Sequence, residues 1–134
     1  MLKIYTDGSS RGNPGPGGYG IVMLYKGNRK ELSQGYKLTT NNRMELTAVI
    51  KALQAIKNNN IEIIIYSDSK YVVESIEKGW VWNWEKNNFK KKQNIDLWKK
   101  FIPLYKSFKI KFIWVKGHAG IKENERCDEL ANLA

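Results

Sequence analysis

The chain has 134 residues, 42% of them hydrophobic, and carries 23 Lys and Arg against 13 Asp and Glu, a net charge of +10. The length suits one domain, and the hydrophobic fraction supports a core and excludes wholesale disorder. No apolar run approaches the roughly 20 residues of a membrane-spanning helix, and the strand-like residues after Met1 do not resemble a signal peptide. Cys127 is the one cysteine. It excludes an intramolecular disulfide and indicates a reducing compartment, so we expect a cytoplasmic location.

The positive charge is concentrated in one segment. Residues 78–111 contain ten lysines against Glu85 and Asp96, so this segment alone carries +8. Such a cationic field is typical of proteins that bind a polyanion, either nucleic acid or an anionic membrane surface. Membrane binding would need a clean amphipathic helix, which the asparagines and glycines here interrupt. We therefore expect a nucleic-acid partner and no membrane.

The first part of the chain predicts three antiparallel strands and a helix. Residues 2–7 form a short alternating strand, and residues 8–18 hold five glycines and two prolines, which predicts an irregular loop. Residues 19–25 and 30–37 are two further strands, joined by a turn at Lys26-Gly27-Asn28. A helix then follows Asn42. Its buried stripe comprises Leu46, Val49, Ile50, Leu53 and Ile56.

The second part alternates strands with helices. The isoleucine-rich run 61–68 suits a central strand covered on both faces. We expect helices over 69–78 (stopped by Gly79), 81–87, 96–107 and 124–134, and a last strand over 109–115. The sequence thus predicts one α/β domain over 1–134, with a five-stranded mixed sheet of antiparallel and parallel strands and helices on both faces.

Four acids are expected to converge at one edge of this sheet. Asp7 and Asp68 each end a predicted strand, and the carboxyl edge of an open α/β sheet is where ligands bind. Glu45 lies in the first turn of its helix, and Asp128 lies in the last helix. Packed acids repel unless a cation compensates them, and hard oxygen ligands favour Mg²⁺ or Mn²⁺. A carboxylate cage of this kind suits two-metal phosphodiester chemistry.

Each acid also has a purely structural interpretation. Asp7-Gly8 is compatible with a simple turn, and Glu45 is placed three residues after Asn42 as in a capping box. Asp68 is placed to cap the helix that begins near residue 69. Asp128, beside Glu125 and Glu129, is compatible with a solvated helix face. From spacing alone both interpretations stay open.

Four long motifs carry a resemblance to a known family. YTDGSSRGNPGPGGYG, TTNNRMEL, YSDSKYV and WVKGHAGIKENERCDELA resemble the bacterial type 1 ribonuclease H family, collinearly from Leu2 to Ala134. The resemblance implies the ribonuclease H fold and a monomeric, Mg²⁺- or Mn²⁺-dependent endonuclease. It cuts the RNA strand of RNA–DNA hybrids with two ions bound, is largely sequence-independent, and leaves 5′-phosphate and 3′-hydroxyl ends.

The resemblance also implies roles for individual residues. Asp7, Glu45, Asp68 and Asp128 correspond to the family's catalytic carboxylates and metal ligands, and His118 corresponds to its mobile histidine, an accessory to turnover. A lone histidine is otherwise more often structural. The remaining correspondences concern the substrate: ribose and minor-groove contacts by Gly8, Asn13, Asn41 and Asn42, a DNA phosphate near Thr40, Asn124 near the site, and a basic protrusion with Trp80, Trp82, Trp84, Lys86, Lys90, Lys91 and Lys92.

The predicted contacts make physical sense, with one departure from the family pattern. An asparagine amide pairs with the 2′-hydroxyl as donor and as acceptor, and lysines add affinity without reading sequence. Alternating Trp80, Trp82 and Trp84 do not share one helix face, so we expect at most one to stack on nucleic acid. Lys70 stands where many members, we expect, carry glutamine beside the substrate, and it adds a cation there.

Three other functions remain as alternatives. A hybrid-binding module without activity leaves the four acids unused, and Mg²⁺-dependent cleavage would eliminate it. A related polynucleotidyl transferase would require a DNA product and strand joining. A basic nucleic-acid chaperone would account for the charge and leave the acids unexplained.

Overall fold

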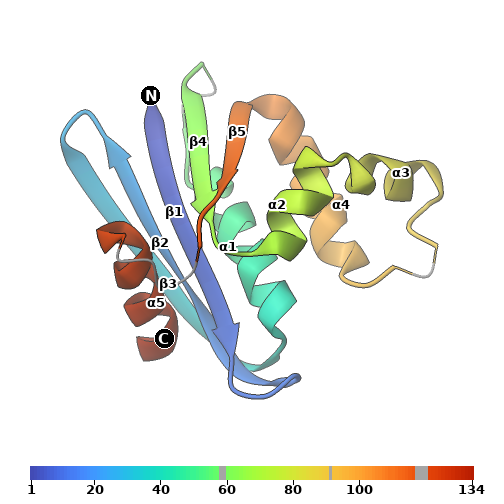
Figure 1. Cartoon of the computed structure of the whole chain (residues 1–134), viewed down its shortest axis with the longest axis horizontal. Helices are drawn as coiled ribbons and strands as arrows, with labels where there is room; N and C mark the ends of the chain where they lie inside the picture. The colour runs from blue at the N-terminus through green and yellow to red at the C-terminus, as the bar shows by residue number, and fades with distance from the viewer. Residues whose placement is uncertain (58–59, 91, 117–120) are drawn as a thin grey trace.

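The computed structural model describes residues 1–57, 60–90, 92–116 and 121–134. Its centre is a five-stranded mixed sheet in the order β3-β2-β1-β4-β5 (Figure 1). β1 pairs antiparallel with β2 and parallel with β4, so it joins the two halves of the sheet. The predicted mixed sheet is confirmed. Its strands are β1 (Leu2–Ser10), β2 (Gly15–Tyr25), β3 (Asn28–Thr39), β4 (Glu62–Ser67) and β5 (Lys109–Trp114).

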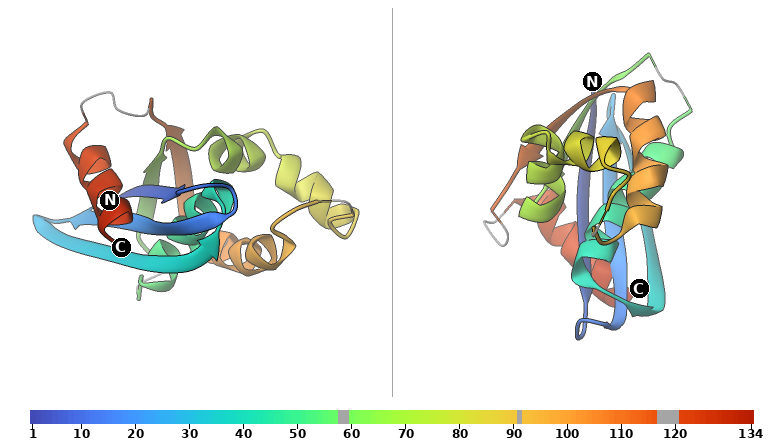
Figure 2. Two further views of the ribbon diagram at one scale, coloured as in Figure 1. Left: turned by 90° about the horizontal axis from the view of Figure 1, so that it is seen from below. Right: turned by 90° about the vertical axis from the view of Figure 1, so that its right-hand side faces the viewer.

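Helices cover both faces of the sheet, as predicted. α1 and α4 lie on one face, and α5 lies on the other face against β2 and β1 (Figure 2). None of the helices in the described ranges is both long and apolar enough to cross a membrane. The helices are α1 (Asn41–Gln54), α2 (Lys70–Glu77), α3 (Trp80–Lys86), α4 (Ile95–Ser107) and α5 (Lys122–Leu133).

The main core lies between the sheet and α1. The predicted stripe on this helix is buried at Leu46, Val49, Ile50 and Leu53, and it packs in one cluster with residues such as Ile4 of β1. Ile56 lies beyond the end of α1 and is only partly buried, because the helix stops at Gln54. This packing sets α1 directly beneath the end of β1.

The prediction that residues 8–18 lack regular structure holds for residues 11–14 and was wrong for the residues on either side of them. β1 and β2 pair through this segment, with Gly8 opposite Tyr19 and Ser10 opposite Gly17. Glycine serves another purpose here: a Cβ on Gly18 would lie 2.7 Å from the Ala131 carbonyl oxygen of α5. The glycines therefore let helices lie against the strand backbone. The sequence near these glycines does not indicate this contact, because α5 lies far away along the chain.

The turn between β2 and β3 is as predicted. Tyr25 pairs with Asn28, and the two residues between them, Lys26 and Gly27, have φ of 48° and 80°. Positive φ at both central positions is the geometry of a tight two-residue hairpin. It fixes the register of the long β2–β3 ribbon.

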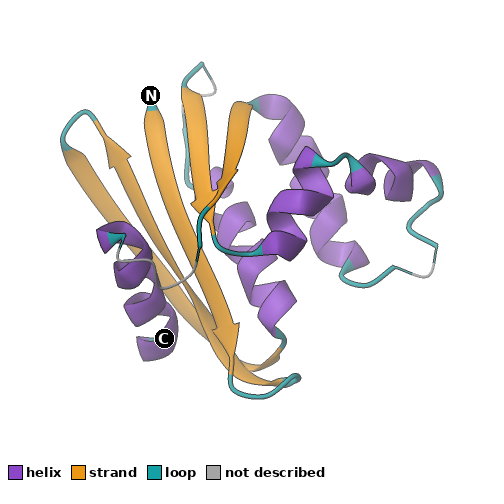
Figure 3. Cartoon of the chain, viewed as in Figure 1, coloured by secondary structure: helices purple, strands orange, loops and turns teal. Residues whose placement is uncertain are grey.

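The projecting part of the basic segment is shorter than residues 78–111. α4 lies against the fold through its buried face, which comprises Leu97, Trp98, Phe101 and Ile102. α3 and the described residues after it, 87–90 and 92–94, stand clear of the sheet (Figure 3). The protrusion is therefore α3 with residues 87–90 and 92–94, and α4 is its anchor.

Candidate active site

Asp7 and Asp68 lie side by side at the carboxyl edge of the sheet. β1 and β4 are parallel neighbours with Thr6 opposite Ser67, and the residue that follows each of these two is one of the acids. Asp7 continues β1 opposite Gly20 of β2, which rules out the simple turn. The strand pairing thus brings together two carboxylates that are 61 positions apart in sequence.

Glu45 reaches this edge from α1. Its side chain is 7% exposed, and its Oε1 accepts a 2.5 Å hydrogen bond from the Gly8 N–H, which also points to the Asp7 Oδ1 at 2.9 Å. A Cβ on Gly8 would collide with the backbone of Met44 and Glu45. Glycine at position 8 therefore allows the first turns of α1 to approach β1.

The capping interpretations of the two acids were wrong. The N-cap of α1 is Thr40, whose Oγ1 accepts from the Arg43 N–H, and the N-cap of α2 is Ser69, whose Oγ accepts from the Val72 N–H. A hydroxyl one position away does the capping work in the second case. Glu45 and Asp68 are free for another role.

Asp128 comes from α5 on the opposite face of the sheet. It lines the same open pocket of about 370 Å³ as Asp7, Glu45 and Asp68, and it is only partly exposed. The structure therefore brings together all four acids predicted from the sequence. The solvated-face interpretation of Asp128 was wrong.

Burial and mutual repulsion keep protons on this cluster when no cation is bound. Burial, then the charges of Asp68 and Asp128, raise the pKa of Asp7 to about 8. Burial, then the charges of Asp7 and Asp68, raise the pKa of Glu45 well above its ordinary value. Deprotonated acids in such a place need a compensating cation.

The donor set fits a divalent metal ion. One carboxylate oxygen each from Asp7, Glu45 and Asp68 lie within 4.8 Å of one another. These are hard oxygen ligands, which bind Mg²⁺ or Mn²⁺ in preference to softer metals. A divalent ion bound by these oxygens would balance the negative charge of the cluster.

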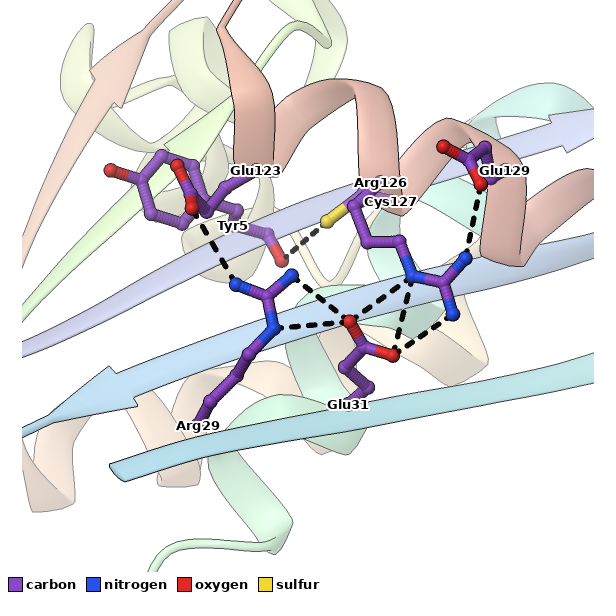
Figure 4. Close-up of polar contacts among 7 residues, drawn as sticks. All are labelled: Tyr5, Arg29, Glu31, Glu123, Arg126, Cys127 and Glu129. Atoms are coloured by element: carbon purple, nitrogen blue, oxygen red, sulfur yellow. Dashed lines mark hydrogen bonds and ion pairs between the residues drawn. The ribbon is translucent and has the colours of Figure 1, made fainter. Parts of the chain in front are cut away.

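A network of ion pairs docks α5, and with it Asp128, on the sheet. Figure 4 shows the Glu31 carboxylate of β3 between two guanidiniums, with Arg29 at 2.9 Å and Arg126 of α5 at 3.1 Å. Arg29 and Arg126 extend the network to Glu123 and Glu129 of the helix. These contacts hold the pKa of Glu31 below its ordinary value.

A small side chain, that of Cys127, lies on the face of α5 that packs against the strands. Cys127 is buried and its thiol donates to the Tyr5 carbonyl at 3.1 Å, while its carbonyl lies against Gly20 of β2. Burial raises the pKa of this thiol. Cys127 therefore serves as a small packing residue beside Asp128.

The predicted asparagines lie around the pocket and also hold its loop. Asn41 and Asn42 line the pocket. The Asn41 side-chain oxygen accepts from the Ser10 N–H at 2.9 Å, and the Asn13 side-chain oxygen accepts from the Asn41 N–H at 3.1 Å. These bonds tie the β1–β2 connection to the start of α1, next to the acids.

The remaining predicted residues divide between the pocket and the protrusion. Gly8 and Lys70 line the pocket, and Thr40 caps the helix beside it. Asn124 lies one turn before Asp128, and its side-chain oxygen is buried with no hydrogen-bond partner among the described residues. His118 and Lys91 lie outside the described residues.

The three tryptophans of α3 have different surroundings, as expected. Trp82 packs on Tyr105 and Trp84 packs edge-on against Trp98, so both anchor α3 to α4. Trp80 is 41% exposed. Among the three it is the one available to stack on a ligand. Lys86, Lys90 and Lys92 are exposed.

Sequence reasoning missed three residues that line the pocket and one beside it. Ser9, Ser69 and Tyr71 line it. All three lie inside the motifs YTDGSSRGNPGPGGYG and YSDSKYV, and this membership was an available signal. Trp114, at the end of β5, donates to the Asp68 carbonyl from a distant part of the sequence. No local pattern indicates that contact.

Comparison with known proteins agrees with this site. The RNase H family profile matches residues 1–134. Ribonuclease H of Desulforamulus reducens is 53% identical over 138 residues, covering 99% of this chain and 86% of the relative. Ribonuclease H of Syntrophus aciditrophicus is 54% identical over 139 residues, covering 100% of this chain and 80% of the relative.

Solved structures share the fold. LC9-RNase H1, a type 1 RNase H with the type 2 active-site motif, superposes with a TM-score of 0.87 at 31% identity, covering 99% of this chain and 71% of that one. LC11-RNase H1 in complex with an RNA/DNA hybrid gives 0.76 at 29% identity, covering 100% and 96%. In sequence, fold and match to the family profile, the chain belongs to the ribonuclease H family.

Proposed function

We propose that the chain is an endonuclease that hydrolyses the RNA strand of RNA–DNA hybrids, with little sequence preference, leaving 5′-phosphate and 3′-hydroxyl ends. The observation that carries the proposal is the convergence of Asp7, Glu45, Asp68 and Asp128 on one open pocket. Its support from outside the chain is membership of the ribonuclease H family. A solved relative, LC11-RNase H1, binds an RNA/DNA hybrid.

We assign the four acids to two Mg²⁺ ions, with Mn²⁺ as a substitute. Bound there, such ions would supply an attacking water of lowered pKa and would stabilise the leaving oxygen. Asp7, Glu45 and Asp68 would hold them, with Asp128 reaching in from α5. The Gly8 N–H orients two of these carboxylates by donating to both.

Recognition of the hybrid is assigned to the rim of the pocket and to the protrusion. Gly8, Asn13, Asn41 and Asn42 would contact ribose 2′-hydroxyls in the shallow minor groove, which is how a protein distinguishes RNA from DNA. Trp80 is expected to stack on the hybrid, with Trp82 and Trp84 as its supports. Asn124 lies near the acids. The remaining expected contacts are to phosphates and come from Thr40, Lys70, Lys86, Lys90, Lys91 and Lys92.

Three further assignments complete the proposal. His118 acts as an accessory that moves protons, so His118→Ala slows turnover without abolishing it. The chain works as a monomer, with residues 1–134 as one catalytic domain. We place its work in the cytoplasm.

One cleavage assay tests the proposed reaction. A labelled 18-mer sequence is prepared as RNA–DNA hybrid, duplex RNA, duplex DNA and single-stranded RNA, and each is incubated with Mg²⁺ or with chelator, beside Asp68→Asn. We expect RNA-strand cleavage in the hybrid alone, dependent on metal and on Asp68. Binding without cleavage in Mg²⁺ and in Mn²⁺ would replace the nuclease with a hybrid-binding module.

A further inference from the structure

Trp114 ends β5 beside the acid cluster and makes two contacts there. Its indole is 42% exposed, which is a large apolar surface at the edge of a sheet. The indole N–H donates to the Asp68 carbonyl oxygen at 3.1 Å. The Lys70 ammonium lies over the same ring, 5.1 Å from its centroid. One side chain therefore contacts both residues on either side of Ser69.

The contacts hold the turn that carries Asp68. This turn connects β4, which ends at Ser67, to α2, which begins at Lys70. The end of β5 donates to two consecutive carbonyls of it: the Val115 N–H to Ser67 at 2.9 Å, and the Trp114 indole to Asp68. The backbone that aims the Asp68 carboxylate is thus fixed from the neighbouring strand.

The second contact gives Lys70 a place away from the acids. Lys70 lines the same pocket as Asp7, Glu45 and Asp68, so its ammonium is attracted toward their carboxylates. An ammonium bound among them would compete with a divalent ion. The face of an indole ring attracts the same cation and holds it at the rim.

We propose that Trp114 is a positioning residue of the metal site: its N–H fixes the turn bearing Asp68, and its ring keeps the Lys70 ammonium out of the carboxylate cluster. The inference rests on the metal-dependent function proposed above. The inference concerns the affinity of the free protein for a divalent ion, so this affinity is measured without substrate.

Two substitutions separate the contacts. Trp114→Phe keeps an aromatic face for Lys70 and removes the N–H, so we expect Mn²⁺ binding weaker by about threefold. Trp114→Leu removes both contacts and weakens Mn²⁺ binding by about tenfold. Adding Lys70→Gln to the leucine variant removes the competing cation and restores the affinity to that of Trp114→Phe.

The measurement is Mn²⁺ binding by the full chain, followed by electron paramagnetic resonance or calorimetry, with circular dichroism to verify folding. Lys26→Gln is the matched control, since Lys26 lies 5.3 Å from the Tyr25 ring centroid at the β2–β3 turn. This control leaves Mn²⁺ affinity unchanged. It removes the same charge and the same kind of contact.

Two results would overturn the inference. Wild-type Mn²⁺ affinity in Trp114→Leu would remove the positioning role, and a failure of Lys70→Gln to restore binding would remove the competition by Lys70. Hybrid cleavage by the wild-type protein is assayed in the same preparation. A wild type that binds Mn²⁺ and does not cut the hybrid would refute the proposed function while the comparison of Mn²⁺ affinities still tests Trp114.

Discussion

The acid cluster and the protrusion hold charge in opposite ways. The acids are enclosed: Glu45 is 7% exposed, Asp7 and Asp68 are partly buried, and paired strands and a packed helix fix their backbones. The lysines at 86, 90 and 92 are exposed on a short helix and the connection after it, which project from the fold.

This difference teaches that the two kinds of charge contribute to different steps. Like charges crowded in a partly buried pocket oppose folding until a cation or protons neutralise them. Exposed lysines are screened by solvent and salt, so they cost the fold little and attract a polyanion from a distance. We expect changes in the cluster to affect catalysis steeply, and changes in the protrusion to affect binding by degrees.

The largest expected effect is that of Asp7→Asn. Cleavage of the hybrid falls by at least about a thousandfold, since one carboxylate of the metal cluster is lost. The metal-free variant is more stable than the wild type at pH 7.5, by about 1 kcal/mol or more, because a buried repulsion is removed. Product formation on gels and denaturant unfolding in chelator measure the two effects.

The same acid predicts how stability depends on pH. The unfolded chain releases the Asp7 proton near pH 3.8, whereas the folded, metal-free protein holds it to about 8. Because the folded state binds more protons in this window, the free energy of unfolding falls as pH rises from about 4 to about 8. Asp7→Asn flattens that fall. An equal slope in wild type and variant would contradict the repulsion.

Gly20→Ala tests whether the enclosure of the cluster matters. The added Cβ would collide with the Cys127 carbonyl and lie 2.7 Å from Leu130 Cβ, so α5 and Asp128 are displaced. We expect a loss of about 2 kcal/mol in the free energy of unfolding and about a tenfold loss in kcat. Gly27→Ala is the control: its φ of 80° strains an alanine although no atom lies within 4 Å, so it also loses stability but keeps kcat. Equal kcat values in the two variants would contradict this docking.

Reversing charges on the protrusion tests the other side of the comparison. The double variant Lys90→Glu/Lys92→Glu lowers affinity for the hybrid by about tenfold and reduces its salt slope by about 2, since two phosphate contacts are lost. The value of kcat at saturating hybrid is unchanged. Lys26→Glu/Lys30→Glu changes net charge equally at the distant hairpin. A similar loss in that control would assign the effect to overall charge.

The smallest expected effect is that of Arg126→Gln. It removes the guanidinium that joins α5 to Glu31, and exposed ion pairs of this kind contribute little. We expect about a threefold loss of kcat with no change in salt slope, and a partial recovery in Arg126→Lys. A loss as large as that of Asp128→Asn would mean that this network, and not the glycine packing, positions the acid.

The neighbouring positions of Asp7 and Asp68 were predictable, although β1 continues past Asp7 to Ser10. Asp7 and Asp68 each follow an apolar strand, and parallel neighbouring strands place such residues together. The capping alternatives were wrong because Thr40 and Ser69 are also suitable caps. Local spacing does not decide between neighbouring candidates; the tertiary pairing does.

Other features depend on contacts between distant segments. Gly18 indicated a loop, yet it lies in a paired strand, where its missing Cβ leaves room for α5 from the far end of the chain. Trp114 alternates like any strand residue. Only its position next to β4 shows that it contacts Asp68.

The most direct test of the account measures binding and cleavage separately on one labelled RNA–DNA hybrid with Asp68→Asn. Affinity is measured by fluorescence anisotropy in Mg²⁺, and cleavage is followed on the same sample. The account predicts an affinity within about threefold of the wild type, since the lysines supply most of it, together with no detectable cleavage. Wild-type cleavage by Asp68→Asn, or loss of hybrid binding in the folded variant, would contradict the claim that the acids carry out cleavage and the lysines supply binding.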